Sequence, residues 1–326
     1  MIQLSEITWL HWTAFLGAIL FFLALDLGVF HRKAHVVRFR EALVWTAVWF
    51  VLAMLFAAFI VPNNPGKGWL SGPRSEFITG YILELSLSMD NVFVIALIFG
   101  YFQVRLEYQH RVLFWGILGA LIMRGVMIGV GAALVAKFHW ILYFFGGFLV
   151  ITGFKMIFAD DEGVHPEHNP VVRLARRFFP VAKDFDGQHF TTRQGGRWML
   201  TPLALVLIVV ETTDLVFAVD SIPAIFGVTQ ETFVVFTSNV FAILGLRSLY
   251  FVLAGMIGYF RFLKIGLSVV LIYIGGKMVA AFFDVKISSN LSLGIVVGII
   301  MASIIVSLVA ARWKREEKRT DTAPRD

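Results

Sequence analysis

Nine long apolar stretches alternate with short polar segments along the chain. Each stretch holds about 20 residues, which is the length of helix that crosses a bilayer core of about 30 Å. We therefore predict an all-α fold, a polytopic membrane bundle of about nine transmembrane helices. The predicted spans are 8–30, 42–61, 77–100, 112–135, 139–158, 200–227, 232–257, 265–283 and 290–311.

Composition agrees with this pattern, because 58% of the 326 residues are hydrophobic and the mean hydropathy is +0.79. Repeated apolar runs in such a chain are typical of integral membrane proteins. The chain has no cysteine, which excludes disulfides, thiolate metal sites and cysteine redox chemistry. The first span starts too late, and carries Asp26 too deep, for a cleaved signal peptide.

Lysine and arginine positions predict the orientation. With the N-terminus outside, the cytoplasmic segments hold 20 of the 28 basic residues, the opposite loops hold 4, and the remaining 4 lie inside spans. Basic residues accumulate on the cytoplasmic side of membrane proteins, so we predict a cytoplasmic C-terminus; the resemblance given below implies that the membrane is the bacterial inner membrane. The net charge of +6 follows from this placement and needs no nucleic-acid partner.

The chain is predicted to form one transmembrane domain over 1–311. Within this domain a cytoplasmic loop is predicted at 159–199. A polar tail, expected to be disordered, follows the domain at 312–326. The loop contains ADDEGVHPEHNP, which we interpret as a solvated charge run rather than a metal sensor. It also contains PVVRLARRFFP, an expected interfacial helix on anionic membrane lipid.

Acidic residues inside the sixth span give the strongest functional signal. The stretch ETTDLVFAVDSIPA places Glu211 and Asp214 three residues apart, on one helical face, with Asp220 further on. Pro223 cannot donate to the carbonyl of Val219, so we expect the helix to break near Asp220 and free carbonyl oxygens there. Each intramembrane acid costs about 2.5–3.5 kcal/mol, so three in one span require a partner, a proton or a cation.

The third span carries a second acidic cluster, ELSLSMDNVFV. Glu84 and Ser88 are four residues apart, and Asp90 is followed by the amide of Asn91. Carboxylate, hydroxyl and amide oxygens suit hard divalent cations. Met89 is a softer ligand candidate, but packing is the more common role of methionine.

One intramembrane acid has two interpretations of equal weight. Asp26 in the first span is either a helper carboxylate of the pathway or an acid neutralised near the interface by Arg32 or Lys33.

Charged residues repeat with a regular spacing. Asp90, Arg124 and Lys155 are separated by 34 and 31 residues, and Asp214, Arg247 and Lys277 by 33 and 30. We therefore predict two homologous three-helix units, 77–158 and 200–283. An odd number of spans inverts the second unit, and inverted repeats with a midplane site are typical of transporters. The six intraspan acids exceed the four bases by two negative charges, which one divalent cation would balance.

The motifs ELSLSMDNVFV and ETTDLVFAVDSIPA resemble signatures of the TerC family, Alx-like branch. The resemblance extends to LDLGVFHRKAH and TSNVFAILGLRSLYF, and thus covers nearly the whole chain. It implies manganese export through the acids Glu84, Asp90, Glu211, Asp214 and Asp220. The residues expected to support that metal site are Asn91, Ser88, Met89, Arg124, Arg247, Lys155, Lys277 and Asp26.

We therefore expect a secondary-active exporter of divalent cations, Mn²⁺ as its transported substrate, coupled to protons through these carboxylates. We expect no enzyme activity and no organic cofactor. Two alternatives stay open at this point: a small-solute or amino-acid exporter, and a membrane factor that assists metal-handling proteins. Five clustered carboxylates count against a site for larger solutes, and the HPEH cluster is not the HExxH motif of zinc hydrolases.

The basic-residue distribution makes a topological prediction. A reporter fused after Asp326 should be cytoplasmic, and one inserted at Asn63 or Asn64 should be outside. Accessibility labelling of both fusions in intact cells measures this, and a C-terminal reporter on the outside would refute the nine-span topology.

Overall fold

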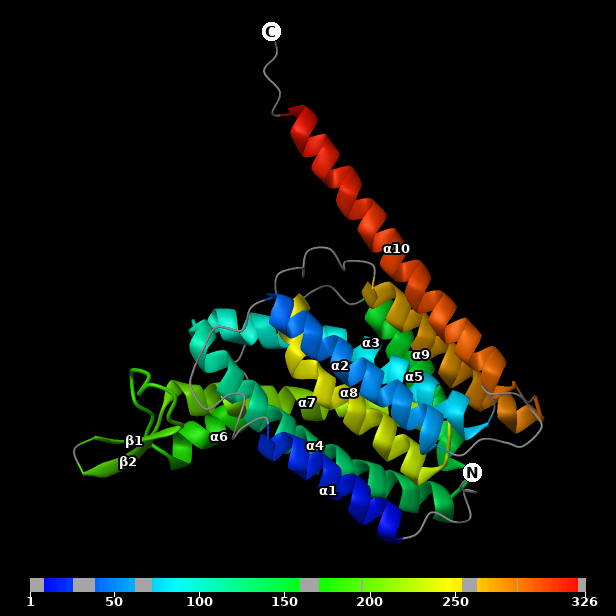
Figure 1. Cartoon of the computed structure of the whole chain (residues 1–326), viewed down its shortest axis with the longest axis horizontal. Coiled ribbons are helices and arrows are strands. Elements are labelled where there is room, and N and C mark those ends of the chain that lie inside the picture. The colour runs from blue at the N-terminus through cyan, green and yellow to red at the C-terminus, as the bar shows by residue number, and fades with distance from the viewer. Residues whose placement is uncertain are drawn as a thin grey trace.

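The computed structural model describes residues 9–25, 39–61, 72–158, 170–194, 196–253, 263–285 and 287–321. Its elements, seen in Figure 1, are α1 (Trp9–Leu25), α2 (Phe39–Phe59), α3 (Pro73–Tyr101), α4 (Leu106–Lys137), α5 (Ile141–Phe158), α6 (Pro170–Phe178), β1 (Thr191–Gln194), β2 (Arg197–Leu200), α7 (Pro202–Phe226), α8 (Thr232–Leu253), α9 (Leu263–Ala280), a 3₁₀ turn (Ala281–Phe283) and α10 (Ser289–Asp321).

Each of the nine predicted spans corresponds to one long helix. Within the described residues, eight helices are long and apolar enough to cross a membrane. The ninth long helix is α1, whose 17 described residues are slightly fewer than the about 20 that cross a bilayer core. The predicted all-α membrane bundle is therefore confirmed.

Helix α8 lies at the centre of the bundle. Most of its side chains are buried, and it packs against α2, α3 and α4. An aromatic cluster joins α1, α2, α3 and α8, in which Phe56 lies 5.0 Å from Phe241 and 5.4 Å from Phe77 between ring centroids. Such tilted and edge-on ring pairs stabilise helix contacts beyond the area that they bury.

Helices at equivalent positions of the two predicted units run antiparallel to each other. On α3 and α7, Gly80 lies against Ile225 while Asn91 contacts Asp214. On α4 and α8, Gly125 lies against Phe236. Inverted units produce this arrangement. The inverted repeat itself stays a prediction, which this packing supports.

Helices α5 and α9 touch backbone to backbone through glycines. A Cβ atom on Gly275 would lie 2.5 Å from the carbonyl oxygen of Gly146, and one on Gly153 would lie 2.8 Å from that of Ser268. Aligning GFKM with GGKM makes Gly153 equivalent to Gly275 and Gly146 equivalent to Ser268. The proposed two-fold relation therefore maps the contact between Gly275 and Gly146 onto the contact between Gly153 and Ser268. Small residues permit such close approach. Close packing matters in a bilayer, because the hydrophobic effect does not drive helices together there.

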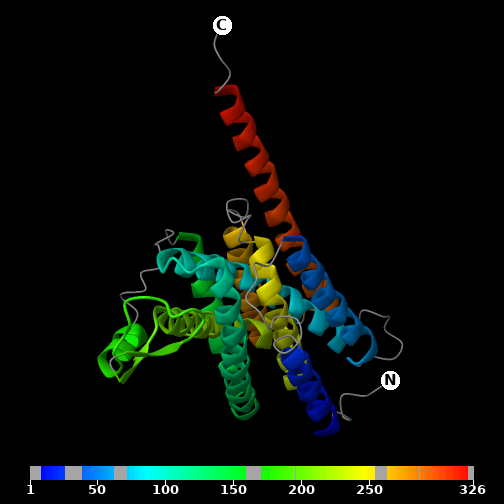
Figure 2. The same ribbon diagram turned by 60° about the vertical axis from the view of Figure 1, so that its left-hand side comes forward.

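The loop 159–199 contains more structure than the sequence analysis predicted. The expected helix is present as α6, and its position on the membrane surface stays a prediction. A β-hairpin that we did not predict follows, with Thr191 opposite Leu200. A hairpin signal was present in TTRQGGRWML, since Gly196 adopts a φ of 82° at the turn. Figures 1 and 2 show α6 and the hairpin projecting from one side of the bundle.

The tail was predicted wrongly. Helix α10 continues to Asp321 and extends beyond the other helices, so residues 312–321 are helical rather than disordered (Figure 1). The lysines, arginines and glutamates of this segment are good helix formers, and no glycine or proline occurs before Pro324. The charged segment 312–321 therefore continues the helix of the apolar span before it.

The glycine contact predicts a position-specific cost. Gly275→Ala should destabilise the protein by about 1–3 kcal/mol, because the added methyl meets the backbone of Gly146, which cannot move aside easily. Gly276→Ala is the matched control, since a Cβ there meets no described atom within 4 Å. Thermal unfolding in detergent measures both variants, and equal melting temperatures would contradict the close packing of α5 on α9.

Candidate functional site

A buried arginine lies at the middle of the bundle. Arg124 of α4 is 1% exposed. Its Nη2 and Nε atoms donate to the two carboxylate oxygens of Asp214 at 2.8 and 3.1 Å, and its Nη1 donates to Glu84. Arg124 is therefore paired with two intramembrane acids, and these pairs join α3 and α7 through α4.

Helical spacing brings these groups together. Glu84, Ser88 and Asn91 are four and three residues apart, so they share one face of α3. The Asn91 amide donates to Asp214 at 3.5 Å, which adds a second contact between the two helices. The α3 cluster ELSLSMDN and the α7 cluster ETTD, recognised separately in the sequence, thus face each other across one interface.

The charges at this centre do not cancel. Glu84 and Asp214 carry two negative charges if both are ionised, whereas Arg124 carries one positive charge. Glu211 lies three residues from Asp214 on α7 and interacts with it electrostatically. A buried excess of negative charge is costly, so this centre favours an additional proton or cation.

A glycine that the sequence analysis missed makes room for Glu211. A Cβ atom built on Gly119 of α4 would overlap the Glu211 carboxylate. The carboxylate therefore rests against bare backbone on the helix that also carries Arg124. Only the tertiary packing reveals this role, because an isolated glycine in an apolar span has no distinctive pattern.

Asp220 lies apart from the arginine. It lies beside Thr152 and interacts electrostatically with Lys155, both on α5. The predicted break at Pro223 is wrong, because α7 continues to Phe226 and Pro223 lies within its last turn. A proline disturbs the turn that precedes it, and here that turn, which carries Asp220, stays helical.

The second repeat lysine has partners that we did not predict. Lys277 of α9 donates to Ser292 at 3.4 Å and interacts electrostatically with Glu76 of α3. Glu76 in turn accepts a hydrogen bond from Ser289 at 3.0 Å. This group joins α3, α9 and α10 near the start of α3.

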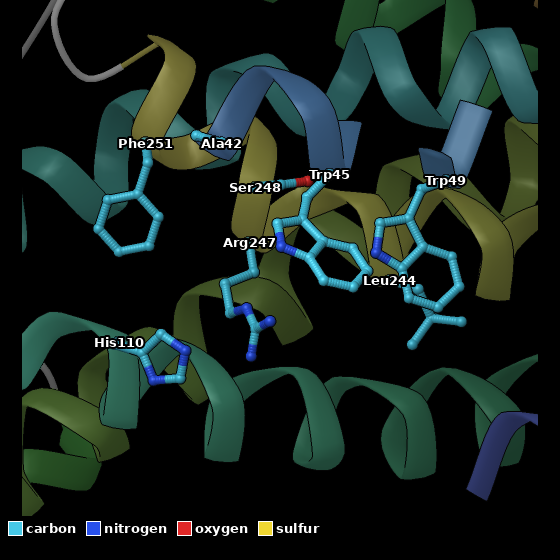
Figure 3. A pocket seen from close by; sticks show the side chains of 8 residues that line it. All are labelled: Ala42, Trp45, Trp49, His110, Leu244, Arg247, Ser248 and Phe251. Atoms are coloured by element: carbon cyan, nitrogen blue, oxygen red, sulfur yellow. The ribbon is translucent and has the colours of Figure 1, made fainter. Parts of the chain in front are cut away.

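Arg247 lies on α8 beside a small pocket. In Figure 3 its side chain lies beside Trp45 and points toward α4, which carries His110. The repeat makes Asp90 the counterpart of Asp214, and hence the expected partner of Arg247. Asp90 is half-buried on α3. Its pairing with Arg247 and its place in the metal site both stay predictions, and Asp26 lies outside the described residues.

The acids do not form a ready metal cage in this conformation. Across the described part of the chain, no three histidine, aspartate or glutamate side chains are grouped to hold a metal ion. The reason lies in the geometry above: both oxygens of Asp214 and one of Glu84 face the Arg124 guanidinium. A cation would have to replace the arginine to use them.

Comparisons with known proteins identify the relatives of this chain. The family described as "Integral membrane protein TerC family" matches residues 72–319. The "Uncharacterized membrane protein STKORF319" of Myxococcus xanthus is 51% identical over 303 residues, 92% of each chain. The "Putative membrane-bound redox modulator Alx" of Escherichia coli (strain K12) is 44% identical over 301 residues, 91% of this chain and 93% of that protein. No solved structure matches the chain.

The ion pairs predict a rescue between Arg124 and Asp214. Arg124→Gln leaves two buried carboxylates without their cation, which should cost about 3–5 kcal/mol and lower the yield of folded protein. The double variant with Asp214→Asn removes one of the stranded charges and should recover much of that loss. Size-exclusion profiles and melting temperatures in detergent measure both.

The control is Arg105→Gln, because Arg105 pairs with Glu107 at 3.7 Å on an exposed surface, where an ion pair contributes little. A double variant no more stable than Arg124→Gln would show that the pair does not couple the helices.

Proposed function

The chain belongs to the TerC family of integral membrane proteins, and on that premise we propose that it exports divalent cations. Mn²⁺ is the proposed principal substrate, moved outward across a bacterial inner membrane. In this proposal the N-terminus lies outside and the C-terminus in the cytoplasm, and the protein acts as a carrier rather than an enzyme. The relatives' names do not state a substrate, so the site chemistry has to support the choice.

One observation carries the proposal: Arg124 binds a carboxylate from each of the two units, Glu84 on α3 and Asp214 on α7. A positive side chain thus occupies the place between the acids where a cation would bind. We infer that Arg124 and the cation compete for the same oxygens. When the cation enters, the guanidinium withdraws, and when the cation leaves, it returns and keeps the acids neutralised.

Ligand chemistry favours a hard divalent ion. Glu84, Glu211 and Asp214 offer carboxylate oxygens, and Asn91 adds an amide oxygen, with no sulfur ligand from cysteine. Such sites suit Mn²⁺, Mg²⁺ and Ca²⁺. In this proposal Asp90 completes the site through the two-fold relation, and Asp220 beside Lys155 serves a neighbouring step of the path.

Proton return supplies the energy in this mechanism. Moving two charges outward against 100 mV costs about 4.6 kcal/mol, at about 2.3 kcal/mol per charge. Two protons carried inward on the same carboxylates would cancel this electrical work. The carboxylate of Glu211, which rests against Gly119 at the end of a flexible side chain, is suited to take up such a proton.

The units would rock against each other to alternate access. Close contacts between α5 and α9 at Gly146 and Gly275 give a narrow axis without bulky side chains. The midplane site then stays fixed while either end opens. The ion pairs of Arg124 join α3, α4 and α7, so these pairs would change when the bundle switches between its two open states.

The function is tested with Asp214→Asn. This substitution keeps the size of the side chain but removes one charge, and it leaves Arg124 balanced by Glu84, so the protein should still fold. Mn²⁺ efflux should fall to background, since a divalent ion is not desolvated without compensating charge. The measurement is Mn²⁺ flux in proteoliposomes, normalised to folded protein.

Asp184→Asn is the matched control, because Asp184 is exposed in the 159–199 loop and should transport normally. Wild-type flux in Asp214→Asn would remove the residue from the path. A wild-type protein that moves no divalent cation would instead favour the alternative of a membrane factor for metal-handling proteins.

A further inference from the structure

Three buried polar side chains near the centre of the bundle have unused hydrogen-bonding capacity. Asn239 of α8 is 0% exposed, and neither its Oδ1 nor its Nδ2 has a hydrogen-bond partner among the described residues. The same holds for the hydroxyls of Ser221 on α7 and Ser88 on α3. Buried polar atoms are almost always paired, so unpaired ones indicate a missing water or ligand.

Asn239 lies at the level of Arg124. Ile128 of α4 and Val235 of α8 belong to one buried cluster, and Gly125 lies against Phe236. The two helices are antiparallel. Arg124 is one residue and Asn239 three residues from the Gly125–Phe236 contact in the same direction along the bundle, so both lie within one turn of it.

Ser221 lies at the level of Glu84. Gly80 of α3 lies against Ile225 of α7, and Asn91 contacts Asp214 further along the same antiparallel pair. Glu84 is four residues from Gly80 toward Asn91, and Ser221 is four residues from Ile225 toward Asp214. Both side chains therefore lie one turn from the same contact, on the facing sides of α3 and α7.

These placements put unpaired neutral groups around the arginine-held acids. We propose that Asn239 and Ser221 are neutral oxygen ligands of the transported cation, used when Arg124 releases Glu84 and Asp214. This inference rests on the proposed function and extends its site to α8, which supplies no acid to it. The Asn239 carbonyl and the Ser221 hydroxyl, with Ser88, bring the oxygen count toward the six or more that hard cations require.

The geometry also explains why the unpaired atoms are tolerated. A neutral ligand group without a local hydrogen bond can turn to the cation without first losing a contact. Ser238, the neighbour of Asn239, shows the contrast, because its hydroxyl bonds to the Val235 carbonyl of its own helix at 3.2 Å. Asn239 has no such local bond to break.

The test compares Asn239→Leu with the wild-type protein in two measurements. Leucine is nearly isosteric and removes both unpaired atoms, so the cation-free protein should melt at the same or a higher temperature. Mn²⁺ binding, measured by electron paramagnetic resonance on purified full-length protein in nanodiscs, should weaken about tenfold or more. Ser221→Ala should weaken it in the same direction, and it is the smaller change should the leucine variant fold poorly.

Thr237→Val is the matched control on α8. Thr237 is also 0% exposed, but its hydroxyl already bonds to the Phe233 carbonyl at 2.7 Å, so Mn²⁺ affinity should stay at the wild-type value. The inference is overturned if Asn239→Leu or Ser221→Ala binds Mn²⁺ as tightly as the wild type, since water alone would then occupy these groups. It is also overturned if Asn239→Leu lowers the cation-free melting temperature and leaves affinity unchanged, as a structural asparagine would.

The two proposals fail in different ways. If the wild-type protein binds none of Mn²⁺, Mg²⁺ and Ca²⁺, the proposed function falls, and this inference with it. If the wild type binds a cation and both variants bind it equally well, only the assignment of Asn239 and Ser221 as ligands is overturned.

Discussion

The buried ion pairs of Arg124 organise the centre of this protein. An arginine that is 1% exposed in a membrane bundle is unfavourable unless its charge and its donors are satisfied. Two carboxylates from different helices meet that need, and so α3, α4 and α7 must stay in register with one another. A guanidinium suits this role better than an ammonium, because its planar fork binds Asp214 through two parallel donors and still has Nη1 for Glu84.

The same pairs explain why the acids are stable without a metal ion. Three ionised carboxylates at one level of a bilayer would repel each other strongly in the absence of any cation. Arg124 supplies an internal cation that stays in the protein. In the proposed transport cycle, a cation would therefore replace an existing favourable contact rather than fill an empty, repulsive cage. Such an exchange would keep the resting protein folded and prevent the ion from being held too tightly to leave.

Hydrophobicity predicted the spans because the bilayer imposes their length. Even the loop-rich region around 159–199 yielded its helix α6, which PVVRLARRFFP encodes as an amphipathic segment. The errors occurred where lipid imposes no rule. The hairpin at Thr191–Leu200 depends on turn chemistry, and the helical extension of α10 past residue 311 depends on local propensity. Pro223 was misjudged because losing the single backbone hydrogen bond to the Val219 carbonyl does not by itself end a transmembrane helix.

The site was predictable to the extent that charge is visible in a sequence. Glu84, Asp214 and Arg124 stand out because charges are rare in apolar spans, and the repeat spacing relates Asp214 to Asp90 and Arg124 to Arg247. The contacts of the acids were not visible in the sequence. Asp220 and Glu211 look alike in ETTDLVFAVD and both lie on α7, but Asp220 lies against α5 and Glu211 against α4. Neutral groups are harder still to recognise: Asn239 differs from any polar residue of an ordinary helix only in lacking a partner. Partnership is a property of the tertiary structure, so the neutral groups of the proposed cation site become apparent only once the helices are packed together.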